Sequence, residues 1–279
     1  MAKRKTTSSD KNIDKNIETA VENKSITIYN LAYEYLLNIL PDGLKESDLD
    51  KYFVGDSRNP ESLKDIFIRL ITSAQNYQSM PKVINFKERK ETIGRILDDY
   101  DYVKIAQMPT DNLYDMFWVT FNFKNKSSSY NSWRKWSNAV IDSAKFVSEF
   151  TDIVDFKHFI KLFDYNVHTR IALPLYISTK IKGIGFALAC DALKELGYLE
   201  YPKPDVHIIR LFNELELSSK KPISVFEAVV KMAEDNKVTP YRVDKLLWLI
   251  CSGRFYKDDK QVGGHRDDFI KYVKGHIKR

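Results

Sequence analysis

The sequence predicts an all-α protein, and three observations lead to that class. Glycine and proline are few, at 10 and 9 residues in a chain of 279, whereas good helix formers are abundant. Apolar residues make up 43% of the chain, which is enough for a substantial core. They recur at helical spacing along most of the sequence, and we find no internal repeat and no sustained heptad pattern. We therefore expect helices packed in one large domain or in two lobes.

The N-terminal segment differs from the rest of the chain. Residues 1–23 are polar, mixed in charge and poor in aromatics, which predicts a disordered tail. Lys3, Arg4 and Lys5 could contact a polyanion, or they could simply keep the tail solvated. From Ile26 the letters I-T-I-Y-N-L-A-Y-E-Y-L-L-N-I-L have the spacing of a first helix, which ends before Pro41.

The remaining helices follow from the same spacing. We expect Asn59 to cap the second helix, with Pro60 at its first position, and this helix to be buried. Further helices are expected over Phe86–Asp98, Asp111–Trp118, a segment running toward Glu149, Phe156–Phe163, Leu173–Lys180, Phe186–Leu196, Val206–Leu215, Val225–Glu234 and Tyr241–Cys251. Ser252-Gly253 has the composition of a helix stop.

Charge and cysteine content limit the classes of function. The formal net charge of +6 suits a polyanionic partner such as nucleic acid, although a modest lysine excess is common in proteins without one. Cys190 and Cys251 lie in apolar helical contexts, so we expect buried thiols, and two cysteines are too few for a disulfide framework or a four-cysteine metal cluster. No apolar run approaches the roughly 20 residues that cross a membrane. We expect a cytoplasmic protein, associated with the nucleoid if its source is a bacterium, and no membrane partner.

The segment F-K-N-K-S-S-S-Y-N-S-W-R-K-W, Phe123–Trp136, has four basic residues and no acidic one. Aromatic rings interleaved with lysine and arginine could face nucleic acid. Aromatic residues on a helix are more often part of the core, and both interpretations stay open.

The stretch T-K-I-K-G-I-G-F-A-L-A, Thr179–Ala189, predicts two helices joined by a very tight turn. Gly183 and Gly185 flank Ile184, and glycine permits positive φ and close approach of another group to the backbone. The free N–H groups that begin the second helix could hold a DNA phosphate without reading a base, with Lys180 and Lys182 adding charge beside them. An ordinary helix corner with a glycine cap explains this stretch equally well.

The stretch Y-P-K-P-D-V-H-I-I-R, Tyr201–Arg210, places Asp205 at a helix N-terminus. Pro202 and Pro204 stiffen the approach to it, and a helix follows at once. Asp205 could be only an N-cap, which is a common device worth about 1 kcal/mol. A cap can also be a catalyst, because the positive end of the helix favours an ionised carboxylate, which a reaction that develops positive charge requires.

Taken together, these motifs resemble the helix-hairpin-helix DNA glycosylase superfamily, and within it the endonuclease III group of base-excision glycosylases. The family's hairpin pattern L-P-G-V-G-x-x-x-A, whose seventh position is lysine or another residue, is matched by I-K-G-I-G-F-A-L-A, Ile181–Ala189, and its V-D-x-H motif by P-D-V-H, Pro204–His207. Asp205 follows the seventh hairpin position, Ala187, by 18 residues, a separation that fits the family. L-I-T-S-A-Q-N, Leu70–Asn76, is similar to the family's early L-x-S-A-Q helix end, and the resemblance spans roughly Ile66–Leu215.

The resemblance implies a two-lobed fold with the active cleft between the lobes. Residues 59–197 would form a helical barrel that ends in the hairpin, and residues 24–58 with 198–279 a second lobe that carries Asp205 into the cleft. The hairpin would clamp the DNA backbone through Lys182, Gly183, Ile184, Gly185 and Ala187. Gln75 would fill the gap left by an extruded nucleotide, or it could be an ordinary polar helix end.

The resemblance also bears on the base pocket, the partners and the cofactors. Candidates for the pocket are Tyr77, Tyr130, Trp133, Trp136 and His207, with core packing an alternative for the rings and orientation of the loop an alternative for His207. The partner would be double-stranded DNA, bound by a monomer. We identify no metal-ligand set and expect no cofactor, apart from a monovalent cation that the hairpin backbone could hold.

Two departures from the family pattern refine the expected activity. Members that also cut the strand carry a lysine at the seventh hairpin position, where this chain has Ala187, and neither Lys182 nor Lys194 is in register with it. Cys190 and Cys251 cannot supply the cysteine quartet that holds an iron-sulfur cluster in some relatives. The resemblance thus predicts a monofunctional DNA N-glycosylase of base excision repair that hydrolyses the glycosidic bond with water assisted by Asp205. The alternatives are a non-catalytic DNA-binding protein and a glycosylase that acts in defence against foreign DNA.

Overall fold

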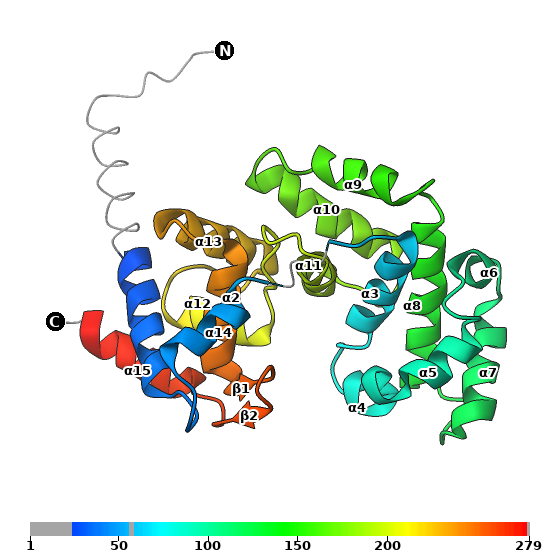
Figure 1. Cartoon of the computed structure of the whole chain (residues 1–279), viewed down its shortest axis with the longest axis horizontal. Helices are drawn as coiled ribbons and strands as arrows, with labels where there is room; N and C mark the ends of the chain where they lie inside the picture. The colour runs from blue at the N-terminus through cyan, green and yellow to red at the C-terminus, as the bar shows by residue number, and fades with distance from the viewer. Residues whose placement is uncertain (1–23, 56–58, 278–279) are drawn as a thin grey trace, which may run out of the picture. The chain divides into compact units, whose positions relative to one another are not determined.

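The computed structural model describes residues 24–55 and 59–277, and the fold is all-α, as predicted (Figure 1). The expected N-terminal tail, with Lys3, Arg4 and Lys5, lies outside the described residues. The described chain divides into two compact units: unit 1 contains residues 24–54 and 204–277, and unit 2 contains residues 55 and 59–203. No helix in the described ranges is both long enough and apolar enough to cross a membrane.

Unit 2 is a bundle of helices around one central helix. Its elements are α3 (Leu63–Ala74), α4 (Met80–Ile84), α5 (Phe86–Ile96), α6 (Tyr102–Ala106), α7 (Thr110–Phe121), α8 (Ser132–Val147), α9 (Ile153–Leu162), α10 (Val167–Lys180) and α11 (Phe186–Glu195). Helix α8 contacts α3, α4, α6, α7 and α10, and α11 packs against both α3 and α10. The sequence of α8 explains its place, because small and large apolar residues, from Trp133 to Val147, are buried on several of its sides.

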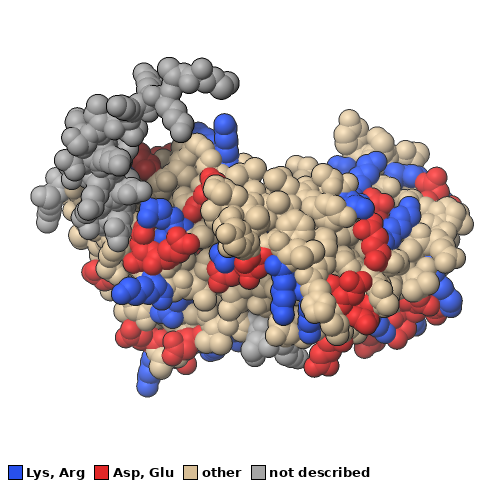
Figure 2. Space-filling view, turned by 90° about the horizontal axis from the view of Figure 1, so that it is seen from above, with Lys and Arg blue, Asp and Glu red and all other residues tan. Residues whose placement is uncertain are grey.

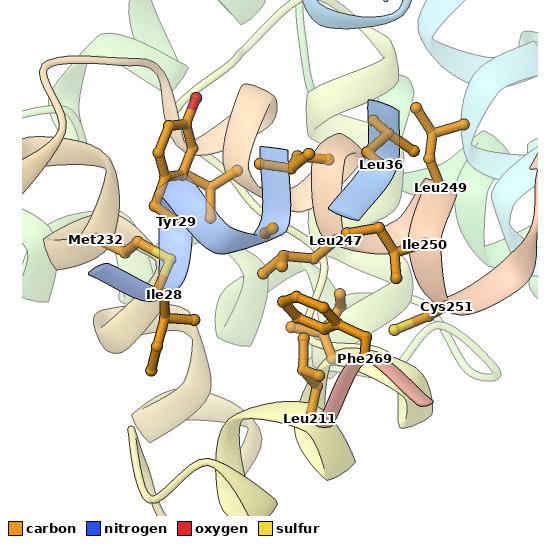
Figure 3. Packing of buried hydrophobic residues seen from close by; sticks show 14 of the residues in the cluster. Ile28, Tyr29, Leu36, Leu211, Met232, Leu247, Leu249, Ile250, Cys251 and Phe269 are labelled. Carbon is orange, nitrogen blue, oxygen red and sulfur yellow. The ribbon is translucent and has the colours of Figure 1, made fainter. Parts of the chain in front are cut away.

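Unit 1 is organised in the same way around α14. Its elements are a first helix over residues 24–38, the 3₁₀ helix η1 (Glu46–Leu49), α2 (Asp50–Phe53), α12 (Val206–Glu214), α13 (Pro222–Asp235), α14 (Pro240–Ser252), β1 (Arg254–Phe255), β2 (Lys260–Gln261) and α15 (Arg266–Ile277). Helix α14 contacts α2, α12, α13 and α15. Figure 3 shows side chains from the first helix, α12, α13, α14 and α15 converging on one core, with Phe269 and Leu211 among them.

Most of the helices lie where their spacing predicted them, but several starts differ. Helix α3 begins at Leu63 and not at Pro60, because Ser62 and Asp65 form a reciprocal capping box in which the Ser62 hydroxyl accepts from the Asp65 N–H. The helix expected from Leu173 begins at Val167, with Pro174 inside it. Asn166 and Thr169 cap this earlier start, and the buried ring of Pro174 costs the helix one backbone hydrogen bond.

Some elements were not predicted. Short helices α4 and α6, the terminal helix α15 and a two-residue antiparallel pairing of β1 with β2 were all missed. Residues 198–203 were expected in the lobe of Asp205 but belong to unit 2. They are held there by hydrogen bonding of the Tyr198 N–H to the carbonyl of Leu193 and by an ion pair between Lys203 and Asp191.

Candidate functional site

The glycine stretch forms the predicted pair of helices with a five-residue turn between them. Helix α10 ends at Lys180 and α11 begins at Phe186. Ile181 and Ile184 are buried, and the Ile184 N–H donates to the carbonyl of Ile181 at 3.1 Å. The two isoleucines therefore fix the turn to the core of unit 2, while Gly183 and Gly185 are exposed to solvent.

The two glycines serve different purposes. Gly183 has φ +98°, a conformation that residues with a Cβ rarely adopt. Gly185 has φ −85° and ψ 177°, which any residue can adopt, and a Cβ built on it would meet no atom within 4 Å. The conformation of the turn thus explains Gly183, whereas no conformation or packing contact explains Gly185, which leaves open space in front of the N-terminus of α11.

Helix α11 begins without a side-chain cap. Gly185 is its N-cap residue, and its carbonyl accepts hydrogen bonds of 3.0 Å from the N–H groups of Leu188 and Ala189. The N–H of Lys182 donates to Oδ2 of Asp142 on α8 at 3.1 Å, which fixes the turn on its other side. Backbone carbonyls of the turn are the ligand type that a hard cation takes, and the monovalent cation expected here stays a prediction.

The charge expected beside the hairpin comes from Lys182 and not from Lys180. Lys182 is exposed, whereas the ammonium of Lys180 lies 2.9 Å from Oε1 of Glu149. Hydrogen bonds to Glu149 and Tyr176 raise the pKa of Lys180 above its ordinary value. The carboxylate of Glu149 therefore offsets the positive charge that Lys180 was expected to add beside the hairpin.

A cation between two exposed aromatic rings lies next to the hairpin turn. The Nζ atom of Lys135 is 5.9 Å from the ring centre of Tyr77 and 5.7 Å from that of Tyr130. Tyr77 is 42% exposed and Tyr130 is 82% exposed. The carbonyl oxygen of Lys135 lies 3.9 Å from the position that a Cβ on Gly183 would take. Two of the predicted base-pocket residues thus have an accessible ring face, and the lysine between them was not singled out from the sequence.

Trp133 and Trp136 are core residues, which corrects their assignment to the base pocket. Both are buried, and Trp133 stacks on Phe121 and Phe123 at centroid distances of 4.7 and 5.6 Å. The indole N–H of Trp136 donates to the carbonyl of Ile71 at 2.9 Å. Neither ring has a free face for a base. Their helical spacing on α8 is the signal that favoured the core.

Gln75 is also placed differently from the expectation. It is the C-cap of α3, only 9% exposed, and its Oε1 accepts a hydrogen bond of 3.0 Å from the N–H of Phe86. The side chain thereby joins the end of α3 to the start of α5. Filling a gap in DNA would require breaking this bond, so in this structure Gln75 is the polar helix end that was the alternative interpretation.

Asp205 is the N-cap of α12, as the sequence predicted. Its Oδ1 accepts hydrogen bonds from the N–H groups of His207 at 2.9 Å and Ile208 at 3.1 Å. Within the described part of unit 1 no hydrogen bond falls on Oδ2, and the residue is only partly buried. One oxygen of Asp205 therefore holds the start of the helix, and the cap does not use the other.

Three charged residues contact His207 or one another beside α12 in unit 1, and two of them lie outside every motif. The guanidinium of Arg266 lies 3.4 Å from Nδ1 of His207, and its Nε donates to Oδ1 of Asp267 at 3.0 Å. Arg210 approaches the same Asp267 oxygen at 3.3 Å. The predicted His207 is thus oriented by a cation that follows it by 59 residues.

Glycine contacts between α14 and the segment before α15 explain how Arg266 reaches this position. Gly253 has φ +63°, and a Cβ on it would lie 1.6 Å from the carbonyl oxygen of Gly263. A Cβ on Gly264 would lie 2.8 Å from the carbonyl oxygen of Cys251. The N–H of His265 donates to the carbonyl of Ile250 at 3.0 Å. Only glycine permits such close backbone packing, which brings the first residue of α15 next to the end of α14.

The two cysteines are buried and form no disulfide, as predicted. Cys251 belongs to the core drawn in Figure 3. Burial, followed by the negative charge of Asp205, raises the pKa of Cys251 to about 12. Its thiol therefore stays protonated at neutral pH and is a poor nucleophile.

Charge on the surface is mixed. Figure 2 shows lysine and arginine side chains interspersed with aspartate and glutamate over the face that it draws. Among the described residues no group of three or more histidine, cysteine, aspartate or glutamate side chains could hold a metal ion. Asp205 belongs to unit 1 and the hairpin to unit 2. The cleft expected between two lobes stays a prediction.

No protein-family model and no curated protein matches this chain. Among solved structures, the chain is similar to the 8-oxoguanine glycosylase/lyase of Methanocaldococcus jannaschii in complex with a 15mer DNA containing 8-oxoguanine. The two chains are 18% identical, the TM-score is 0.49, and the match covers 79% of this chain and 97% of the other. At that TM-score the likeness carries no argument about function, so the function is inferred from the residues described above.

Proposed function

We propose that the protein is a monofunctional DNA N-glycosylase that extrudes a damaged, mismatched or modified base and hydrolyses its glycosidic bond with water. The observation that carries the proposal is the carboxylate of Asp205, which caps α12 with Oδ1 and keeps Oδ2 available for chemistry. A simple cap needs one oxygen. A catalyst that stabilises a cation and orients water needs a second one.

The chemistry assigned to Asp205 begins as the bond between C1′ and the base nitrogen breaks. The bonding electron pair leaves with the base, and the sugar becomes oxocarbenium-like. The negative charge of Asp205 stabilises that cation. A water molecule then adds through its oxygen to C1′ and gives one proton to Oδ2. The departing base takes up a proton from solvent, and Asp205 returns its proton to solvent, which restores the carboxylate. The products are the free base and DNA with an abasic sugar.

The hairpin of unit 2 is assigned to the DNA backbone. Open space beside Gly185 allows a phosphate to approach the N-terminus of α11, where the dipole of that helix favours an anion. Lys182 adds an exposed positive charge. Such contacts fix the register of the protein on the duplex and carry no base specificity.

Accessible aromatic rings beside the hairpin support the extrusion step. Extruding a base costs a few kcal/mol, least for a weakly paired one. Tyr130 and Tyr77 offer ring faces on which an unstacked base could rest, and Lys135 between them offers charge for a neighbouring phosphate.

The nucleophile assigned to the reaction is water because position 187 is alanine. Lys194, the one lysine of α11, is buried, with only 4% of its surface exposed. A lysine that attacks the sugar has to reach C1′, and a buried one is not presented to a ligand.

The experiment that tests the proposal is a panel of duplexes, each with one oxidised, deaminated, alkylated or mismatched base. The duplexes are incubated with the protein and analysed before and after hot alkali. Strand breaks that need alkali, and that disappear with D205N, support the monofunctional glycosylase. Breaks without alkali would indicate a lyase.

A second candidate is a DNA-binding protein that has kept the hairpin and lost turnover, and Ala187 is the observation that favours it. Such a protein would bind the duplexes and release no base from any of them. The same panel, read by band shift and by base release, separates the two candidates.

A further inference from the structure

A buried ion pair in unit 2 lies between the hairpin helix and the segment that leads to Asp205. Asp191 of α11 is 7% exposed, and its Oδ1 lies 3.0 Å from the ammonium of Lys203. The side-chain amide of Asn76 donates to Oδ2 of Asp191 at 3.2 Å. Both carboxylate oxygens thus have a partner, which is the condition under which a buried charge is tolerated.

The charge of this carboxylate is maintained against its burial. Burial alone would raise the pKa of Asp191, but the positive charges of Lys203 and Lys194 lower it to about 2. Asp191 is therefore ionised at any pH at which the protein would meet DNA. The attraction that holds Lys203 is present throughout that range.

The three residues lie within or directly beside the three motifs that carried the resemblance. Asn76 ends the L-I-T-S-A-Q-N stretch, and Asp191 follows the seventh hairpin position, Ala187, by one turn of the same helix. Lys203 precedes Asp205 by two residues. No part of the proposed chemistry uses the ion pair directly, yet it touches each segment that the chemistry needs.

Chain geometry links Lys203 to Asp205. Two residues span at most about 7 Å, so fixing Lys203 confines the backbone of Asp205 to a small volume. Pro202 and Pro204 fix one backbone dihedral each and restrict the residue before them. Because the segment between them is short and stiff, the ion pair that holds Lys203 also restrains the backbone of Asp205.

We propose that Asp191 and Lys203 are positioning residues that restrain the Asp205 segment with respect to the hairpin helix. The inference rests on the proposed glycosylase function for its catalytic consequence. Its mechanical part, the restraint of residues 201–205, does not depend on any activity. A pair that only stabilised unit 2 would affect folding and leave turnover per folded molecule unchanged.

The test compares D191N and K203M with a matched ion-pair control, K64M. Lys64 of α3 pairs with Asp99 at 2.5 Å on the surface of the same unit, and neither residue belongs to one of the three motifs. Single-turnover excision on the best duplex of the panel gives the rate of the chemical step, and band shifts give the DNA affinity. For D191N and K203M we expect that rate to fall at least about tenfold with affinity within about threefold, because small misplacements of a catalytic group reduce the rate steeply.

A second measurement follows the restraint itself by hydrogen exchange of peptides covering residues 198–209, which include the N–H groups that Asp205 caps. In both variants we expect these amides to exchange about tenfold faster or more, because local opening governs exchange, with α8 unchanged. K64M leaves both readouts as in the wild type. If D191N does not fold, K203M alone decides the outcome.

The excision rates test the catalytic consequence of the proposal, and the hydrogen exchange tests the restraint. Normal excision rates in folded K203M would overturn the catalytic consequence, and unchanged exchange at residues 198–209 would overturn the restraint. If the wild type excises nothing, the proposed function fails, and the exchange measurement still decides the restraint.

Discussion

The backbone N–H of His207 donates a hydrogen bond of 2.9 Å to Oδ1 of Asp205, two residues before it at the start of α12. This hydrogen bond requires an acceptor oxygen on the side chain, but it does not require the negative charge of the carboxylate. Asparagine caps helices about as well as aspartate, since its side-chain oxygen accepts the same bond. The relationship therefore allows the structural role of Asp205 to be separated from its proposed chemical one.

Replacing Asp205 by asparagine should abolish base release and leave folding and DNA binding nearly unchanged. The cap is retained, but the negative charge that stabilises the sugar cation is lost. Base release, DNA affinity and the melting temperature are measured on the same preparation. D205A serves as the control, because it removes the cap as well and should cost about 1 kcal/mol of stability. Loss of DNA binding together with activity in D205N would point to a structural cap.

The two hairpin glycines should respond to substitution in opposite ways. G183A forces a Cβ onto a residue with φ +98° and should cost about 1–2 kcal/mol in the free energy of unfolding. G185S keeps a good N-cap residue in an allowed conformation, so stability should not fall. Its side chain occupies the space reserved for a phosphate, so DNA affinity should drop. Denaturant unfolding and band shifts measure both effects, and unaffected DNA binding in G185S would contradict the clamp.

Borohydride should trap no covalent complex between the protein and a substrate duplex. Trapping requires a Schiff base between an enzyme amine and the sugar, and the seventh hairpin position is Ala187. Gel electrophoresis under denaturing conditions detects the complex, with a known bifunctional glycosylase as the positive control. A trapped band from the wild type would identify a lysine nucleophile elsewhere in the chain and exclude water.

Removing the ammonium of Lys135 should weaken DNA binding by about 1 kcal/mol and reduce the salt dependence of binding by about one phosphate contact. Lys135 lies between two exposed tyrosine rings and beside the hairpin turn. Lys145, exposed on the same helix, gives the matched control K145A. Equal losses in K135A and K145A would show a general charge effect and no specific contact.

Acid should destabilise the protein partly through Asp191. The pKa of this group is about 2 in the folded protein against an ordinary 3.8, so the unfolded chain binds its proton more tightly. The stabilisation, about 2 kcal/mol by linkage, is fully present above about pH 4 and is lost as the pH falls toward 2. The free energy of unfolding, measured between pH 5 and pH 2, should fall less steeply for D191N than for the wild type. Parallel curves would contradict this assignment.

The sequence by itself determined that the protein is helical, and it located the hairpin and the aspartate cap of the candidate site. Composition and apolar spacing are local properties, so the all-α class followed from them, as did the two helices around Gly183 and the cap at Asp205. The spacing from Ala187 to Asp205 lies within the chain and was readable directly. Helix α15 could have been found by the same means, because Phe269, Ile270 and Val273 recur at helical spacing.

Tertiary structure decided which side chains were available. Trp133 and Tyr130 belong to one aromatic, basic segment, yet one is buried and the other is the more exposed ring of the pair around Lys135. Gln75 was assigned to DNA from a motif, and the start of α5 engages it instead. Burial depends on what packs against a residue, and that partner is distant in sequence.

Contacts between residues far apart in the chain could not be predicted from the sequence for the same reason. Arg266 reaches His207 only because glycines let the segment before α15 pack on the end of α14. Asp191 meets Lys203 and Asn76 because α11 packs against α3 and the chain returns past it before Asp205. The sequence therefore determined where helices form, and it placed a carboxylate at the start of one helix and a candidate anion site at the start of another. Which charges surround them was decided by the packing of segments far apart in the chain.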